Sequence, residues 1–297
     1  MSIEEDQMYL RKLMDEGHQI PDLAIDLNRI LIPLACQNFE KTGVEVAKQI
    51  AREYGAEVTL LHNGSGNLDK WALPFEEFKL KVNKIHLKES HDKTPDLIVE
   101  EAKNNYQLMI MPSRRRLKWI DKFLINSVSA KVIDRIPYDV LQVFPAATGM
   151  ARDEEKIPVF NHVGILLSRA QRDPRLLLWA NSLLQEENSY LSAYHIADLP
   201  RLTPMRVALD TKVVTKENED FTILTKAYEA LFRTRIEPRF LISHKTALTA
   251  ANILNKDKPD IAVMGQTKNK PWWQIRTLSD KILDTAQVAF ILHHQPK

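Results

Sequence analysis

Two serines stand where a hydroxyl group could bind a phosphate. Ser127 and Ser279 each follow a short apolar segment and a loop, and each lies at the expected start of a helix. Free backbone N–H groups and the helix dipole favour anions at such a place, and the hydroxyl adds a donor. Gly265 ends the apolar segment before Ser279 and would let a phosphate approach the backbone. Serine is also a preferred helix N-cap, and capping is the interpretation that the sequence favours for both.

Basic and aromatic residues occupy the same two loops. Arg114 and Arg115 come directly after the apolar segment LMIMP, where open α/β sheets place their ligands. They could contact an anion, acidic lipid or a partner, or form a solvated loop, which is the favoured interpretation. Trp272 and Trp273 lie in the second loop, near Lys268. Such a pair could anchor a protein interface or cover the local core, and the sequence leaves both open.

No pattern typical of a catalytic or metal site is found. Cys36 and His62 are expected at neighbouring strand ends and could form a thiol–imidazole pair, but a buried, inert cysteine is far commoner. The sequence contains no HExxH motif, Gly-x-Ser-x-Gly elbow or Walker loop. We therefore expect no catalytic residue, no metal and no enzyme activity.

Strand and helix patterns alternate along the chain and position these residues. Short apolar runs without period-two alternation are typical of parallel strands buried on both faces. The expected strands of the first half are 30–34, 57–62, 84–88, 108–111 and 139–144, with helices over 39–55, 94–105 and 126–136 and a loop beginning at residue 63. Right-handed crossovers make such strands parallel.

The same order of elements recurs after a linker rich in charged and small residues, 145–158. The expected strands there are 162–167, 190–196, 237–243, 260–264 and 288–293, with helices over 173–185, 220–233, 246–255 and 277–285. We predict an α/β fold with two tandem open parallel five-stranded sheets and flanking helices. The predicted domains are a lead-in over 1–28 and two repeats over 29–150 and 151–297.

Each half resembles the universal stress protein family, which implies a Rossmann-like fold. The resemblance rests on ILIPL, LMIMPSRRR and NSVSAKVIDRIPYDVLQV in the first half, and on GILLS, IAVMGQTK and TLSDKILDTAQVAFIL in the second. Nucleotide-binding members carry a Gly-x2-Gly-x9-Gly-Ser/Thr loop after the fourth strand and an acidic residue after the first strand. The resemblance therefore indicates where a nucleotide would bind.

That loop is degenerate in both halves. In the first half Pro112, Arg115 and Asn126 hold the three glycine positions, and proline has no N–H to donate. In the second half Gly265 remains, while Lys268 and Leu278 replace the other two glycines. Ala35 and Ser168 hold the acidic positions. The candidate residual nucleotide or anion ligands are Gly265, Lys268, Ser279, Ser168, Ser127, Arg114 and Arg115. No cofactor is expected, and ATP and AMP are the ligands to test.

Composition narrows the class of protein. The 297 residues carry 41 Lys and Arg against 39 Asp and Glu, so a net charge of +2 gives no sign of a nucleic-acid partner. The single cysteine fits a reducing cytosol. No apolar run approaches the roughly 20 residues of a membrane-spanning helix, and the N-terminus does not resemble a signal peptide. We expect a cytoplasmic chain without a transmembrane segment.

Together these features predict a non-catalytic regulatory or scaffolding module. The lead-in and the eroded loops resemble the cytosolic tails of secondary transporters, such as prokaryotic relatives of the cation-chloride cotransporters. This resemblance implies a link to a membrane transporter domain and a place at the inner face of the cell membrane. The alternative is a free-standing tandem universal stress protein that binds ATP or another adenylate through Gly265 and Ser279. A homodimer is expected through the edge of DVLQVF or VAFILHH, since open apolar edges favour aggregation.

Overall fold

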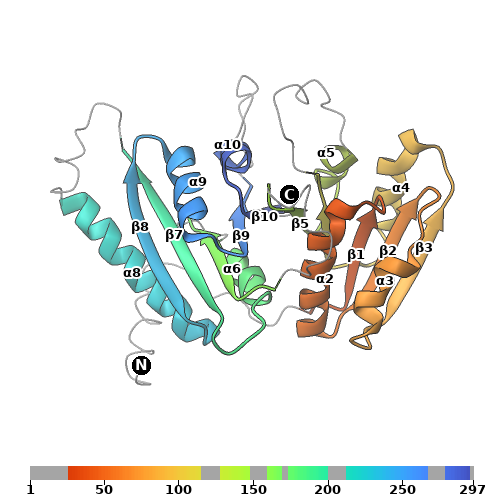
Figure 1. Cartoon of the computed structure of the whole chain (residues 1–297), viewed down its shortest axis with the longest axis horizontal. Helices are drawn as coiled ribbons and strands as arrows, with labels where there is room; N and C mark the ends of the chain where they lie inside the picture. The colour runs from red at the N-terminus through yellow and green to blue at the C-terminus, as the bar shows by residue number, and fades with distance from the viewer. Residues whose placement is uncertain are drawn as a thin grey trace. The chain divides into compact units, whose positions relative to one another are not determined.

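The computed structural model describes residues 26–114, 128–147, 159–168, 173–199, 212–266 and 278–294 (Figure 1). The chain divides into two compact units. The first unit includes residues 24–158 and 289–297, and the second includes residues 159–288. Most of the lead-in and of the linker lies outside the described residues, so the predicted domain limits stay a prediction.

The first unit is built on a mostly parallel sheet whose strands follow the order β3-β2-β1-β4-β5-β10. Its strands are β1 (Arg29–Leu34), β2 (Glu57–Asn63), β3 (Val82–Leu87), β4 (Leu108–Pro112), β5 (Asp139–Phe144) and β10 (Ala289–His294). Its helices are η1 (Asn38–Glu40), α2 (Lys41–Tyr54), α3 (Asp69–Glu76), η2 (His91–Lys93), α4 (Thr94–Glu101) and α5 (Val128–Ile133). The first five strands pair in parallel. This α/β fold with flanking helices confirms the predicted class, but the sheet differs from the predicted five parallel strands, because β10 adds a sixth strand that runs antiparallel to β5.

Alternate residues of the central strands face two separate layers of helices. Leu31, Leu61 and Met109 share one buried cluster with Ile98 of α4 and Val132 of α5. Helix α2 packs against β1, β4 and β5. Side chains alternate between the faces of a strand, so an uninterrupted apolar run such as RILIPL can bury both of its faces. The strand pattern predicted from the sequence follows from this two-sided burial.

Helix α2 begins and ends at positions that the sequence marks. Val44, Ala47 and Ile50 are buried at helical spacing. Gly55 follows the last turn with a φ of 64°, and its N–H bonds to the carbonyl of Ala51. Glycine adopts this left-handed conformation without strain, so the predicted helix end is confirmed.

Helix α3 was not expected. The residues from 63 onward begin as the predicted loop, but Trp71 and Phe75 then bury their side chains on a short helix. Pro74 lies inside that helix, and Gly64 and Gly66 precede it, which made the whole segment look irregular. Packing of the two aromatic side chains outweighs these local signals.

The second unit repeats the parallel arrangement in the order β9-β6-β7-β8. Its strands are β6 (His162–Leu166), β7 (Tyr190–Asp198), β8 (Ile236–Ser243) and β9 (Ile261–Gly265). Its helices are α6 (Asp173–Asn181), α8 (Lys212–Phe232), α9 (Thr246–Asp257) and α10 (Leu278–Thr285). Helix α8 begins earlier than residue 220, where it was expected. Among the described residues, no helix combines the length and the apolar character needed to cross a membrane.

The first two strands of each unit pair in the same register. Arg29 lies opposite Glu57 in the first unit, and His162 lies opposite Tyr190 in the second, at the same separation along the chain. The backbone N–H groups before both leading strands also bond to one side-chain oxygen. That oxygen belongs to Gln107 in the first unit and to Asp260 in the second. The two units therefore share a frame down to individual contacts.

The C-terminal strand corrects the expected dimer edge. Strand β10 pairs antiparallel with β5, with Phe290 opposite Phe144 and Ile291 opposite Val143. Strand β5 also pairs with β4, so both of its edges are used within the chain. The prediction that DVLQVF offers an open edge to a second copy was wrong, because VAFILHH of the same chain occupies it.

Candidate functional site

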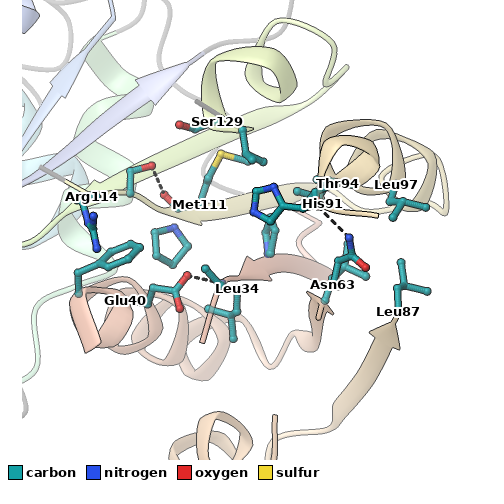
Figure 2. Close-up of a pocket in the computed structure, with 18 residues that line it drawn as sticks. Leu34, Glu40, Asn63, Leu87, His91, Thr94, Leu97, Met111, Arg114 and Ser129 are labelled. Carbon is teal, nitrogen blue, oxygen red and sulfur yellow. Dashed lines mark hydrogen bonds between the residues drawn. The ribbon is translucent and has the colours of Figure 1, made fainter. Parts of the chain in front are cut away.

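A pocket of about 210 Å³ opens at the carboxyl ends of the parallel strands of the first unit (Figure 2). Open α/β sheets place their ligands at this edge, where loops replace paired backbone. The lining residues come from the ends of β1, β2, β3 and β4 and from η1, η2, α4 and α5. They are Pro33, Leu34, Ala35, Phe39, Glu40, Leu61, Asn63, Leu87, His91, Thr94, Leu97, Ile98, Met111, Pro112, Ser113, Arg114, Val128 and Ser129.

Glu40 is a buried carboxylate that folds back onto the loop after β1. Its two oxygens accept hydrogen bonds from the N–H groups of Ala35 (2.6 Å) and Gln37 (2.7 Å). Burial raises the pKa of Glu40, and these backbone N–H groups, with that of Cys36, oppose the shift by stabilising the ionised form. The carboxylate thus uses the backbone donors that an incoming anion would need.

His62 joins the end of β1 to the loop after β2. Its Nδ1 lies 2.9 Å from the carbonyl oxygen of Leu34, and its Nε2 accepts the N–H of Gly66 at 2.8 Å. These two bonds fit the neutral tautomer that carries its proton on Nδ1. Both ring nitrogens are therefore engaged in holding backbone, and neither is free to act as a base.

Cys36 lies beside this histidine without being activated by it. A Cβ atom on Gly66 would come within 2.7 Å of both the Cys36 Sγ and the His62 Nε2, so the three residues meet at one point. Burial, with a smaller contribution from the Glu40 carboxylate, raises the pKa of the Cys36 thiol to about 11. A thiol with so high a pKa stays protonated near neutral pH, and the thiolate is the nucleophile.

On the opposite wall, Asn63 ties the strand end to helix α4. Its Nδ2 donates to the hydroxyl of Thr94 at 2.9 Å, and its Oδ1 accepts the N–H of Glu89 at 2.9 Å. Figure 2 places His91 between this wall and Met111, and its side chain is exposed. The polar side chains of this wall thus hold the pocket together.

The end of β4 forms the remaining wall. Ser113 accepts a hydrogen bond from Gln142 of β5 at 3.0 Å. Arg114 is exposed, and its guanidinium lies 5.5 Å above the ring of Phe39. Pro112 packs so closely on helix α2 that a Cβ atom on Gly43 would come within 2.6 Å of its Cγ. Proline has no N–H here, where the family loop begins with glycine, so the backbone cannot cradle a phosphate at this position.

Of the predicted ligands that lie among the described residues, Arg114 alone lines this pocket. In the second unit Gly265 ends β9 and Ser168 is an exposed residue just after β6. Ser279 is a buried residue of α10 whose hydroxyl lies 3.4 Å from the Oε1 of Gln266. Other predicted residues lie outside the described residues, namely Arg115, Ser127, Lys268, Trp272 and Trp273.

The second unit contains a histidine equivalent to His62 with a different partner. The Nδ1 of His195 lies 3.1 Å from the carbonyl oxygen of Leu167, as His62 lies from Leu34. Its Nε2 faces the carboxylate of Glu217 on α8 at 2.9 Å. Both partners of this ring are oxygen acceptors, whereas His62 faces one carbonyl oxygen and one N–H group. No group of three His, Cys, Asp or Glu side chains suited to a metal occurs among the described residues.

Sequence reasoning missed Glu40, Asn63 and Thr94. Glu40 could have been noticed, because an acidic residue closing the first turn of a helix after a strand is a capping signal. Asn63 and Thr94 are distant in sequence, and only the pairing of β2 with β3 brings their elements together. No local signal links them.

Comparison with known proteins identifies the family of part of the chain. Residues 67–143 match the model of the Universal stress protein family. These residues contribute α4, β4 and α5 to the pocket. No match was found among curated protein sequences. The first unit therefore contains a universal stress protein domain.

Solved structures show the same fold over nearly the whole chain. A universal stress protein from Archaeoglobus fulgidus DSM 4304 is 12% identical with a TM-score of 0.60, covering 91% of this chain and 97% of that chain. A protein of unknown function from Pseudomonas aeruginosa PAO1 is 14% identical with a TM-score of 0.57, covering 90% of this chain and 92% of that chain. At these identities the likeness establishes the fold alone.

Proposed function

We propose that the chain is a non-catalytic regulatory or scaffolding module whose first unit keeps a binding pocket without catalytic chemistry. One observation carries this proposal: the Glu40 carboxylate in the pocket lining and the His62 ring, which lies in β2 between the lining residues Leu61 and Asn63, are committed to holding backbone. His62 uses both ring nitrogens, and Glu40 uses both carboxylate oxygens. A general base or nucleophile needs a free, suitably ionised group within reach of the substrate.

The raised pKa of Cys36 supports the same conclusion. A catalytic cysteine sits in an electropositive setting that lowers its pKa, whereas burial and the nearby Glu40 carboxylate act in the opposite direction. Iodoacetamide should therefore react slowly with Cys36 at pH 7.5 and faster as the pH approaches 11. Rapid alkylation at pH 7.5 would contradict a non-catalytic site.

The direct test of the proposal is turnover. The intact chain should release no phosphate from ATP above the level of a heat-denatured sample. Release that is lost in H62Q or E40Q would identify an enzyme and remove the proposal.

The proposed setting is the cytoplasmic side of a membrane ion transporter of the cation-chloride cotransporter type, with the transporter domain as partner. This rests on the resemblance of the lead-in and degenerate loops to such tails, and fold alone does not assign function. The gene sequence upstream of Met1 provides the test. Several apolar stretches of roughly 20 residues would support the transporter setting, and their absence would contradict it.

A free-standing tandem universal stress protein that binds an adenylate in the second half remains the second candidate. Gly265 and Ser279 favour it by their spacing, while the burial of Ser279 beside Gln266 opposes it. Calorimetry with ATP and AMP, repeated on S279A, distinguishes the two. Submillimolar binding that S279A weakens would establish the second candidate.

Dimerisation, if retained, would need a surface other than the β5 edge, which β10 covers. Sedimentation of the intact chain measures it directly. A monomer at micromolar concentration would remove the homodimer from the proposal.

A further inference from the structure

The floor of the first-unit pocket is apolar. Leu34, Leu61 and Met111 end β1, β2 and β4, and Ile98 of α4 closes the floor; all four are buried. Leu97 lies at the outer part of the wall and is half-buried (Figure 2). Such a surface gains free energy by burying a carbon skeleton.

Two polar side chains of the wall, Asn63 and Ser113, already use hydrogen bonds within the protein. Asn63 bonds to Thr94 and to the backbone of Glu89, and Ser113 accepts from Gln142. A ligand rich in hydroxyl and amide groups would lose its bonds to water here without equal replacement. This disfavours a ribose and a purine edge.

Charge in the pocket favours one negative charge at one end. Among the described lining residues, Glu40 is the carboxylate and Arg114 the guanidinium. Glu40 is buried, whereas Arg114 is exposed over the ring of Phe39. A polyphosphate would bring several negative charges to the end of the pocket that holds both Arg114 and the Glu40 carboxylate, whereas a single carboxylate brings one charge and can form a paired contact with the guanidinium.

The size of the pocket indicates how large a group it can enclose. An apolar cavity of about 150 Å³ accommodates benzene, and sites for drug-sized ligands span about 300–1,000 Å³. At about 210 Å³ this pocket fits one ring with a short substituent. We propose that it binds a small aromatic carboxylate and not a nucleotide, a proposal that rests on the proposed function and names its ligand class.

The test is calorimetric titration of the intact chain with phenylacetate, benzyl alcohol and ATP. Phenylacetate should bind, and benzyl alcohol should bind about tenfold more weakly, because it lacks the charged partner for Arg114. ATP should give no heat of binding at the same concentration. Binding of ATP more tightly than phenylacetate, or no binding of phenylacetate, would overturn the proposal.

Three variants locate the site. L97W places an indole in the pocket from a half-buried position and should abolish binding of both ring compounds. L73W makes the same change at a residue that is 53% exposed and does not line the pocket, so it should bind as the parent does. R114Q should weaken phenylacetate about tenfold and leave benzyl alcohol unchanged.

The outcomes separate this proposal from the proposed function. Equal binding of phenylacetate by L97W and the parent would place the ligand elsewhere and overturn the inference. Circular dichroism of L97W and L73W confirms that both variants are folded. Turnover of ATP contradicts the proposed function, whereas loss of phenylacetate binding without turnover contradicts only the ligand class.

Discussion

His62 and His195 occupy the same place in two units with the same frame, yet they contact different partners. Each ring lies against the carbonyl of the residue that ends or follows the first strand of its unit. His62 accepts an N–H from the Gly66 loop, while His195 faces the Glu217 carboxylate on the long helix α8. The first unit therefore follows β2 with a short loop that leaves a pocket, and the second places a helix side chain against the same ring. A duplicated frame does not duplicate a site, because the segments after its strands differ.

The two units also differ because strand β10, near the end of the chain, pairs with β5 of the first unit. A mutation in β10 should have the largest effect on stability. Phe290 is fully buried opposite Phe144 of β5, so F290A should destabilise the chain by about 3–5 kcal/mol. Urea unfolding measures the loss, and hydrogen exchange locates it. Exchange should rise more in β5 than in β6. A larger rise of exchange in β6 than in β5 would show that β10 stabilises the second unit instead. L73A, at an exposed residue, serves as the control.

Replacing the two histidines compares their structural roles. H62L removes the histidine partner of the buried Leu34 carbonyl and of the half-buried Gly66 N–H, and a buried group left unsatisfied costs about 1–3 kcal/mol. H195L should cost less, because the side chain of Glu217 is 29% exposed and can bind water instead. Urea midpoints of both variants test this order, with H91L, at an exposed histidine, as the control. A larger loss for H195L would mean that the α8 contact is the stronger of the two.

Two glycines test how tightly each unit packs against its sheet. G43A would bring a Cβ within 2.6 Å of Pro112, so we expect a net loss of about 1–3 kcal/mol despite the better helix propensity of alanine. G164A meets its nearest neighbour, Pro259, at 3.1 Å and should cost less. Thermal unfolding of the two variants gives the comparison. Equal midpoints would show that the first unit is no more tightly packed at this point.

The smallest expected effect distinguishes Arg29 from His162, which occupy the same register position. Burial lowers the pKa of His162 below its usual value of 6.5, so the folded chain holds this ring neutral more firmly than the unfolded chain does. Its contribution to stability is present above pH 6.5 and is lost as the pH falls through the lowered value. The first unit has no histidine at this register position, so we expect no such dependence there.

Urea unfolding of the parent and H162Q at pH 5 and pH 7.5 checks this difference. The fall in stability between the two pH values should be smaller in H162Q. An unchanged fall would assign the acid sensitivity to other groups.

Local sequence predicted most elements of both units and few residues of the site. Strand positions followed from apolar runs, and the end of α2 followed from Gly55. Helix α3 was missed because Trp71 and Phe75 are buried by tertiary packing, which outweighs Pro74. Among the predicted ligands that the structure describes, Arg114 alone lines the pocket, because its position follows from the end of a predicted strand.

The sequence by itself determined the alternation of strands and helices and the order of these elements, because these depend on residue type and spacing along the chain. Tertiary structure alone decided that β10 pairs with β5, that Glu40 occupies the backbone donors after β1, and that His62 and His195 meet different partners. These contacts join residues through strand pairing and helix packing, which side-chain burial fixes across distances that no local pattern records.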